Sequence, residues 1–219
     1  MTEAEKKNPA VFCDFDGTIT ARESLEAVLT KFVPGRWQDM KQQLISGEVS
    51  LRTGVRRMIE SISSDRYSEV MEFVRQIPLR PGLEEFLDFL GTRGIPFVIV
   101  SGGLRAMVEA GLGSLIEKVH AVFAADVKTG GPYLRVVSEY EAGDELVAKA
   151  GIIRGFDAEP RIVIGDGMTD FNMAETADLV FARDSLADYL EKTGISYIKW
   201  DDFFRIRHEL AERIEKGLI

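Results

Sequence analysis

Two aspartates at the end of an apolar run constrain the fold of this chain more than any other feature. Residues 10–13 are apolar and lead directly into Asp14 and Asp16, which a glycine and a threonine follow. We interpret this segment as a buried strand that delivers two carboxylates to a loop. Such carboxylates repel each other unless a cation or a shared proton relieves the repulsion. In open α/β sheets, ligands bind beyond the carboxyl ends of the strands, so the position suits chemistry.

Short apolar runs alternate with helical patterns along most of the chain. This alternation predicts an α/β fold with a parallel sheet and helices on both faces. Apolar residues at helical spacing predict a helix from Leu83 to Leu90 and a closing helix from Phe203 to Ile214. The predicted strands are 10–14, 96–100, 161–165, 178–182 and 195–199.

Residues 21–79 differ from the rest because their apolar residues follow helical spacing without strand-like alternation. Val55, Met58 and Ile59 are examples of this spacing. We expect an inserted helical cap over 21–79 and a core made of residues 1–20 and 80–219. Within the core, two short apolar stretches in 121–137 flank a Gly-Gly-Pro turn, which we expect to form a minor flap beside the site.

The composition excludes several classes of protein. The formal charge is −9, from 27 basic and 36 acidic residues, which argues against a nucleic-acid partner. Cys13 is the only cysteine, so an intramolecular disulfide is impossible and an oxidising compartment is not indicated. The polar segment 1–7 precedes no long apolar stretch, so we predict neither a signal peptide nor a membrane span. We expect a cytoplasmic protein with no membrane partner, and the oligomeric state stays open.

Two further motifs follow later predicted strands. Ser101 and two glycines end one apolar run, and Gly165-Asp166 ends another, with Asp170 four residues after Asp166. With the Asp-x-Asp-Gly-Thr motif at Asp14, these motifs resemble those of the haloacid dehalogenase-like phosphohydrolases, in the same order. The resemblance covers roughly Val11 to Ile214. It implies a Rossmann-like core, and it implies that the cap between the first two motifs covers the active site.

The resemblance also implies the roles of the acidic residues. Asp14 is expected to be the nucleophile that forms an aspartyl-phosphate. Asp16 is expected to protonate the leaving oxygen and then to deprotonate the attacking water. Asp166 completes a Mg²⁺ site with Asp14 and the Asp16 carbonyl, and Asp170 holds that site from beside or behind Asp166.

The phosphate is expected to bind to Ser101 and to the backbone N–H of Gly102, at the amino terminus of a helix. Family members also carry a basic residue shortly before the Gly-Asp motif. Lys149 lies about one helical turn away from the usual place, so a surface position and a position at the phosphate are both open. Lys128, near the Gly-Gly-Pro turn, is the other candidate.

Two narrower resemblances point to different substrates. Residues 50–58, 95–97 and 178–184 resemble the methionine-salvage phosphatases of 2-hydroxy-3-keto-5-methylthiopentenyl-1-phosphate. Glu23 and Arg56 instead match the pair with which phosphoserine phosphatases hold an ammonium and a carboxylate group. The alternative is that neither residue binds a ligand: Glu23 then lies at the start of a helix, and Arg56 is solvated.

We therefore predict a Mg²⁺-dependent phosphatase of a small phosphorylated metabolite, with the salvage phosphatases as the nearest resemblance. Phosphoserine phosphatase is the alternative substrate class, and an aspartyl-phosphate can also transfer its phosphoryl group to a small alcohol. An inactive phosphometabolite-binding protein is a further alternative, which the displaced Lys149 alone motivates.

Overall fold

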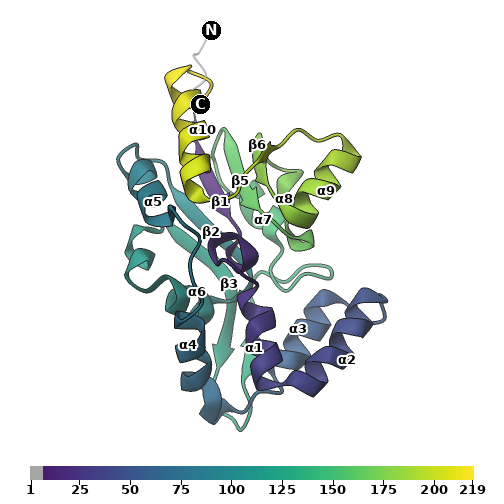
Figure 1. Cartoon of the computed structure of the whole chain (residues 1–219). Helices are drawn as coiled ribbons and strands as arrows, with labels where there is room; N and C mark the ends of the chain where they lie inside the picture. The colour runs from purple at the N-terminus through teal and green to yellow at the C-terminus, as the bar shows by residue number, and fades with distance from the viewer. Residues whose placement is uncertain (1–6) are drawn as a thin grey trace.

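The computed structural model describes residues 7–219, and one seven-stranded sheet organises them (Figure 1). The predicted core boundary and polar segment at residues 1–6 lie outside the described part. The strand order is β4-β3-β2-β1-β5-β6-β7, and all neighbouring strands are parallel except β3 and β4. The strands are β1 (Ala10–Cys13), β2 (Phe97–Leu104), β3 (Ala121–Lys128), β4 (Arg135–Val137), β5 (Arg161–Gly165), β6 (Leu179–Ala182) and β7 (Ile198–Lys199).

Strand β1 occupies the middle of the sheet, between β2 and β5. Val11 pairs in register with Phe97 on one side and with Ile162 on the other. All four residues of β1 are buried, because helices cover both faces of a parallel sheet. The loop after β1 therefore begins at the centre of the carboxyl edge, which is where Asp14 lies.

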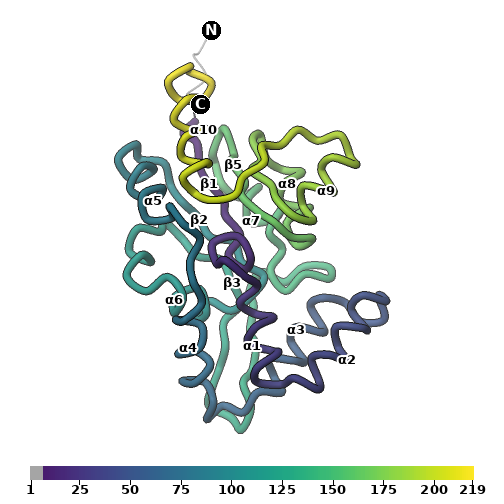
Figure 2. Tube along the Cα trace, viewed as in Figure 1, coloured from purple at the N-terminus to yellow at the C-terminus, as the bar shows by residue number. Residues whose placement is uncertain are grey.

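Helices pack on both faces of the sheet, as the sequence predicts. On one face α5 and α10 pack together, and their residues Leu83, Phe86, Phe203 and Ile206 are buried in one apolar cluster (Figures 1 and 2). Helices α7, α8 and α9 contribute to a second cluster on the other face. The helices of the sheet region are α5 (Leu83–Gly91), α6 (Arg105–Leu112), α7 (Lys149–Arg154), α8 (Phe171–Ala174), α9 (Asp184–Thr193) and α10 (Phe203–Glu215).

Four more helices occupy the segment predicted to be a helical cap. They are α1 (Ser24–Phe32), α2 (Pro34–Ile45), α3 (Leu51–Ile59) and α4 (Tyr67–Arg75). Figure 1 shows α1, α2 and α3 beside the lower part of the sheet, with α2 and α3 at the lower right, while α4 runs beside α6. The two connections to this segment pair with each other, because Thr20 and Leu79 form an isolated antiparallel bridge. The division between core and cap at 21–79 stays a prediction.

The sheet is larger than the sequence predicts. The stretch that begins at Ala121 forms β3, which pairs in parallel with β2, so the expectation of a separate minor flap is wrong. The predicted turn is correct, since β3 and β4 form an antiparallel hairpin around it. The hairpin tip extends to the helical segment, where the Ser64 N–H donates to the Pro132 carbonyl over 3.0 Å. The predicted strand 195–199 is reduced to the two residues of β7.

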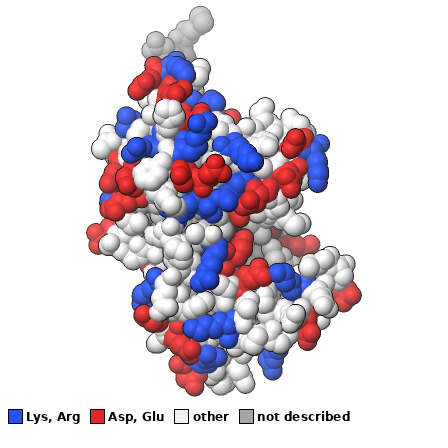
Figure 3. Space-filling view, in the orientation of Figure 1, with Lys and Arg blue, Asp and Glu red and all other residues white. Residues whose placement is uncertain are grey.

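Charged side chains of both signs share the visible face of the molecule. Figure 3 shows Lys and Arg side chains interspersed with Asp and Glu side chains on this face. Among the helices of residues 7–219, none has the length and the apolar composition that a bilayer-spanning helix needs.

Candidate active site

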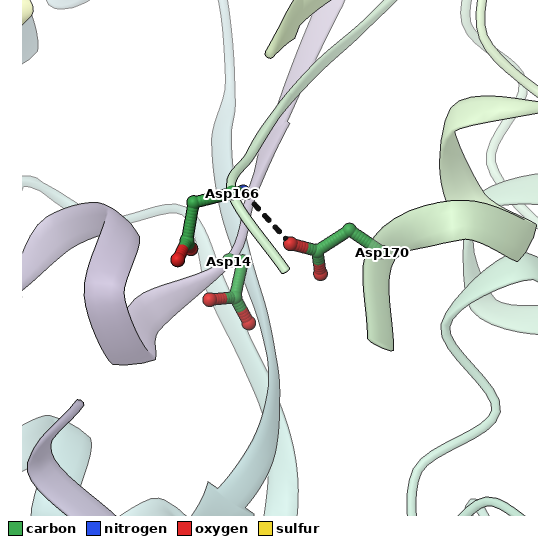
Figure 4. Close-up of side chains that lie close together, drawn as sticks. All are labelled: Asp14, Asp166 and Asp170. Carbon is green, nitrogen blue, oxygen red and sulfur yellow. Dashed lines mark hydrogen bonds between the residues drawn. The ribbon is translucent and has the colours of Figure 1, made fainter. Parts of the chain in front are cut away.

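Three aspartates from different elements meet at the carboxyl edge of the sheet (Figure 4). Asp14 follows β1, Asp166 follows β5, and Asp170 lies in a short 3-10 turn before α8. One carboxylate oxygen of each lies within 4.8 Å of the others, and all three residues are buried. Adjacent parallel strands end at the same edge, so the folding of β1 beside β5 brings Asp14 and Asp166 together.

Asp170 uses both of its carboxylate oxygens to organise this cluster. Its Oδ2 accepts a hydrogen bond from the backbone N–H of Asp166 over 3.0 Å (Figure 4). The same oxygen accepts one from the backbone N–H of Gly167, also over 3.0 Å. Its Oδ1 accepts a hydrogen bond from Lys149 Nζ over 2.7 Å. Asp170 therefore holds the turn that carries Asp166, and its part in a metal site stays a prediction.

Lys149 is buried beside the acidic cluster, and its binding of phosphate stays a prediction. It is the first residue of α7 and only 1% exposed, and its Nζ donates to both Asp14 and Asp170. Burial alone lowers the pKa of Lys149, but the attraction of the two carboxylates outweighs it and raises the pKa above its usual range. The surface alternative for Lys149 is wrong. Lys128 is exposed on the β3–β4 hairpin and lines a different groove.

Asp16 connects the loop after β1 to the helical segment. Its Oδ1 accepts hydrogen bonds from the backbone N–H groups of Ser24 and Leu25, each over 3.0 Å, and from the Ser24 hydroxyl. These donors are at the start of α1, so Asp16 caps that helix from eight residues upstream. Burial raises the pKa of Asp16, while the hydrogen bonds from Ser24 and Leu25 act in the opposite direction.

The turn after Asp16 fits closely against Asp166. Gly17 has a φ of +80°, and a Cβ there would lie 2.5 Å from Asp166 Oδ2, so a side chain does not fit. The Thr18 hydroxyl donates to Asp166 Oδ1 over 2.5 Å. Burial raises the pKa of Asp166 to about 6, against the effect of this hydrogen bond. Thr18 is the threonine of the Asp-x-Asp-Gly-Thr motif, which is the signal in the sequence for this contact.

Ser101 and Gly102 lie near these aspartates but not at a helix terminus. Strand β2 continues through Leu104 and α6 begins at Arg105, so the predicted placement at a helix amino terminus is wrong. Ser101 is fully buried, and its hydroxyl oxygen accepts a hydrogen bond from the Gly103 N–H over 3.0 Å. Gly102 and Gly103 line the cavity beside Asp14 and Asp16. Their binding of phosphate stays a prediction.

The site carries an excess of negative charge that a hard cation would balance. Burial raises the pKa of Glu23 to about 8, and the charges of Asp16 and Asp166 add to this effect. All the acidic donors are oxygen atoms, which suit hard divalent cations rather than soft metals. The site therefore fits a metal of this class. Against the single lysine, Lys149, the cavity lining and its floor hold seven acidic residues of the described chain, which are Asp14, Asp16, Glu23, Glu26, Glu145, Asp166 and Asp170.

The acidic cluster forms the floor of a cavity of about 230 Å³. The walls above this floor are largely apolar, and they come both from the helical segment and from the loop before α7. The sequence alone does not identify this lining, because its residues come from separate segments of the chain. Its apolar members are Leu25, Trp37, Leu51, Val55, Leu146, Val147 and Met168.

The structure does not bring the predicted substrate pair together. Glu23 lines the cavity, but Arg56 is absent from its lining. The Arg56 guanidinium donates to the Val136 carbonyl over 2.7 Å and forms an ion pair with Glu141. Arg56 therefore joins α3 to the segment around β4, and its side chain stays about one-third exposed, at 31%.

Comparisons with known proteins agree with this geometry. The model of the haloacid dehalogenase-like hydrolase family matches residues 11–175. A 2-hydroxy-3-keto-5-methylthiopentenyl-1-phosphate phosphatase from Microcystis aeruginosa is 46% identical over 205 residues, which cover 93% of this chain and 98% of the relative. The enzyme of the same name from Bacillus cereus is 32% identical over 216 residues, covering 95% and 98% of the two chains.

Solved structures share the fold at lower sequence identity. A phospho-aspartyl intermediate analogue of phosphoserine phosphatase superposes with a TM-score of 0.67 at 21% identity, covering 97% of this chain and 99% of that one. This likeness confirms the predicted Rossmann-like core with its parallel sheet. The sequence relatives confirm the predicted enzyme class, a phosphatase. The chain belongs to the haloacid dehalogenase-like hydrolase family.

Proposed function

We propose that this protein is a Mg²⁺-dependent phosphatase of a small phosphorylated metabolite with an apolar tail. The observation that carries the proposal is the buried contact of Lys149 with Asp14, at the floor of a cavity with apolar walls. The metabolite we propose is 2-hydroxy-3-keto-5-methylthiopentenyl-1-phosphate, after which the two sequence relatives are named.

We assign the nucleophile and the acid–base group to the two aspartates after β1. The Asp14 carboxylate attacks phosphorus, the bond to the leaving oxygen breaks, and Asp16 gives that oxygen a proton. Oδ1 of Asp16 already accepts three hydrogen bonds, so the transferable proton belongs on Oδ2. Water then attacks the aspartyl-phosphate, Asp16 takes a proton from this water, and phosphate leaves Asp14.

Asp14, Asp166 and the Asp16 carbonyl are the proposed ligands of Mg²⁺. When bound, the ion supplies positive charge to the phosphoryl oxygens and so reduces their repulsion of the Asp14 carboxylate. Asp170 acts from behind, since its two oxygens are engaged with Lys149 and with the turn that carries Asp166. This assignment follows the family resemblance, and the proximity of the carboxylates supports it.

The phosphoryl group is proposed to bind between Lys149 and the Ser101-Gly102 segment. Lys149 keeps its positive charge at the Asp14 carboxylate, which is where an anionic phosphate must approach. The alternative of an inactive binding protein depended on a displaced lysine, and the contact of Lys149 with Asp14 removes that motive. Gly102 lines the cavity and allows close approach of a ligand.

The cavity favours an uncharged substrate tail over phosphoserine. A substrate carboxylate needs a basic partner when it is buried. Arg56 is held by Val136 and Glu141 outside the cavity, and Lys149 is the only basic residue among the lining residues of the described chain. The apolar walls instead suit a methylthio group. Residues 21–79, as the proposed cap, supply part of these walls through Trp37.

Phosphate release from a panel of phosphomonoesters tests this proposal. The panel contains the methylthiopentenyl phosphate, phosphoserine and a short alkyl phosphate, each assayed with Mg²⁺ and with excess chelator. We expect chelator-sensitive release that is fastest for the methylthiopentenyl phosphate. Preferential hydrolysis of phosphoserine would overturn the substrate assignment. A rate of phosphate release that is unchanged by the chelator would overturn the role of the metal.

A further inference from the structure

Arg80 forms hydrogen bonds with the turn that follows Asp14 and Asp16. Its Nε donates to the Thr18 carbonyl over 2.8 Å, and its Nη2 donates to the carbonyls of Gly17 and, over 3.5 Å, Thr20. One guanidinium thus satisfies three carbonyls of a single tight turn. The planar fork of arginine suits such a multiple contact, whereas a lysine ammonium lacks this geometry. The turn cannot move away from β1 without breaking these bonds.

Trp200 connects Arg80 to the other side of the acidic cluster. The indole ring is buried, and the Arg80 guanidinium lies 5.1 Å from the ring centroid. Its Nε1–H donates to the carbonyl of Gly165 over 3.4 Å, and Gly165 is the residue before Asp166. The same side chain therefore contacts the residue that holds the first aspartate loop and the strand end that carries Asp166.

A second arginine completes this contact. The Arg183 guanidinium lies 5.5 Å from the centroid of the Trp200 ring. Both guanidinium groups donate to the Asp201 carbonyl, Arg80 over 3.4 Å and Arg183 over 3.2 Å. Two like charges in proximity repel each other, and the carbonyl that accepts from both and the ion pair of Arg183 with Asp184, over 2.8 Å, offset this repulsion.

The backbone of Arg80 adds a further connection. Its N–H donates to the Ile19 carbonyl over 2.8 Å, beside the bridge between Thr20 and Leu79. Arg80 thus also lies where the chain returns from the helical segment. Its backbone joins the two connecting segments, and its side chain holds the turn of the first motif.

We propose that Arg80, together with Trp200, is a positioning residue that holds the Asp14–Asp16 loop in register with Asp166. None of its contacts is with the cavity itself, so it acts through the residues that line the cavity. The inference rests on the proposed Mg²⁺-dependent phosphatase activity and adds a residue pair to it. Loss of Arg80 should weaken binding of Mg²⁺ and lower kcat, while the apolar walls that determine KM stay in place.

The test compares Arg80→Ala with Arg93→Ala. Arg93 is a matched control, because its guanidinium also lies over an aromatic ring, 4.0 Å from the centroid of Phe89, and donates to a carbonyl, but at the far end of α5. Calorimetric titration of the substrate-free protein with Mg²⁺ measures binding without any turnover. We expect the Mg²⁺ dissociation constant and kcat of Arg80→Ala each to worsen by roughly 10–100-fold, as is common for residues behind metal ligands. KM should stay within about threefold, and Arg93→Ala should match the wild type.

Two further measurements separate positioning from simple loss of stability. Millimolar guanidinium ion should restore part of the Mg²⁺ affinity of Arg80→Ala, and ethylammonium ion should not. Trp200→Phe retains an aromatic ring but loses the donor to Gly165, so it should weaken Mg²⁺ binding even if Arg80→Ala does not fold.

Two results would overturn the inference. One is wild-type Mg²⁺ affinity and kcat in a folded Arg80→Ala protein that only melts at lower temperature. The other is wild-type Mg²⁺ affinity in Trp200→Phe. If the wild type itself bound Mg²⁺ but hydrolysed no phosphomonoester, the proposed function would fail while the titrations still decided the positioning role.

Discussion

Lys149 Nζ lies 2.7 Å from Asp170 Oδ1 and donates at the same time to Asp14, so one buried ammonium group is shared by two carboxylates. Lys149 begins α7, Asp14 follows β1 and Asp170 lies in the 3-10 turn before α8, so the three meet only in the folded chain. A buried ion pair of this kind is costly to break, because the remaining charges lose their partner without gaining water.

Replacement of Lys149 by methionine should therefore damage both stability and turnover. We expect a loss of roughly 3–5 kcal/mol in the free energy of unfolding of the metal-free protein, since Asp14 and Asp170 are left uncompensated. We expect kcat to fall by about a thousandfold or more, as for groups that act directly on the reacting atoms. Chemical denaturation and steady-state kinetics measure the two effects. Lys128→Met removes an exposed lysine and should change neither, and a kcat within tenfold of wild type in Lys149→Met would contradict its role.

Glu23 should make the metal-free protein less stable as the pH rises. Burial raises its pKa from 4.5 to about 8, so the folded state holds a proton that the unfolded state releases. The unfolded state binds fewer protons between these values, and the free energy of unfolding therefore falls as the pH increases from 4.5 to about 8. Thermal unfolding in chelator, from about pH 5 to about pH 9, measures how the stability changes with pH.

Glu23→Gln should flatten that slope and raise the melting temperature above pH 8, the value to which the Glu23 pKa is raised. The matched control is Glu72→Gln, because Glu72 is an exposed residue of α4 that pairs with Arg75 over 3.0 Å. An unchanged slope in Glu23→Gln would show that another group carries the pH dependence.

Arg56→Ala should affect stability rather than substrate binding. The guanidinium joins α3 to Val136 and Glu141, so its loss should lower the melting temperature by several degrees, as expected for about 1–2 kcal/mol. KM for the methylthiopentenyl phosphate should remain within about twofold, because Arg56 does not line the cavity. Arg57→Ala is the control, as Arg57 is an exposed neighbour on the same helix. A large rise in KM for Arg56→Ala alone would restore the phosphoserine-like assignment.

Trp37→Ala should raise KM for a substrate with an apolar tail. Removal of the indole takes away part of the apolar wall, and we expect a loss of about tenfold or more in kcat/KM. A short alkyl phosphate, which does not reach this wall, should be hydrolysed as by the wild type. Equal losses for both substrates would indicate a structural effect, and no loss for either would remove Trp37 from the substrate site. Trp37→Phe should retain most of the activity.

Much of the site could be predicted because it depends on where strands end. Asp14 and Asp166 follow apolar runs, and parallel pairing of β1 with β5 is enough to bring them to one edge. The buried positions of α5 and α10 could also be predicted from the sequence, since Phe86 and Phe203 belong to a regular helical spacing.

Other features depend on contacts between distant parts of the chain, and no local pattern reports them. Lys149 contacts Asp14 because the loop before α7 places it there, and the sequence of this loop has no periodic pattern. Arg56 is turned from the cavity by Glu141, which is 85 residues away. The extension of β2 to Leu104 depends on its pairing with Ala125 of β3, so two glycines before it do not end the strand.

Trapping of the phosphorylated enzyme tests the central claim most directly. The protein is mixed with the methylthiopentenyl phosphate and Mg²⁺, quenched in acid within the first turnover, digested and analysed by mass spectrometry. We predict a phosphoryl group on Asp14 in the wild type, and no phosphopeptide and no turnover in Asp14→Asn. Turnover by Asp14→Asn at the wild-type rate, or a phosphoryl group on another residue, would contradict the account.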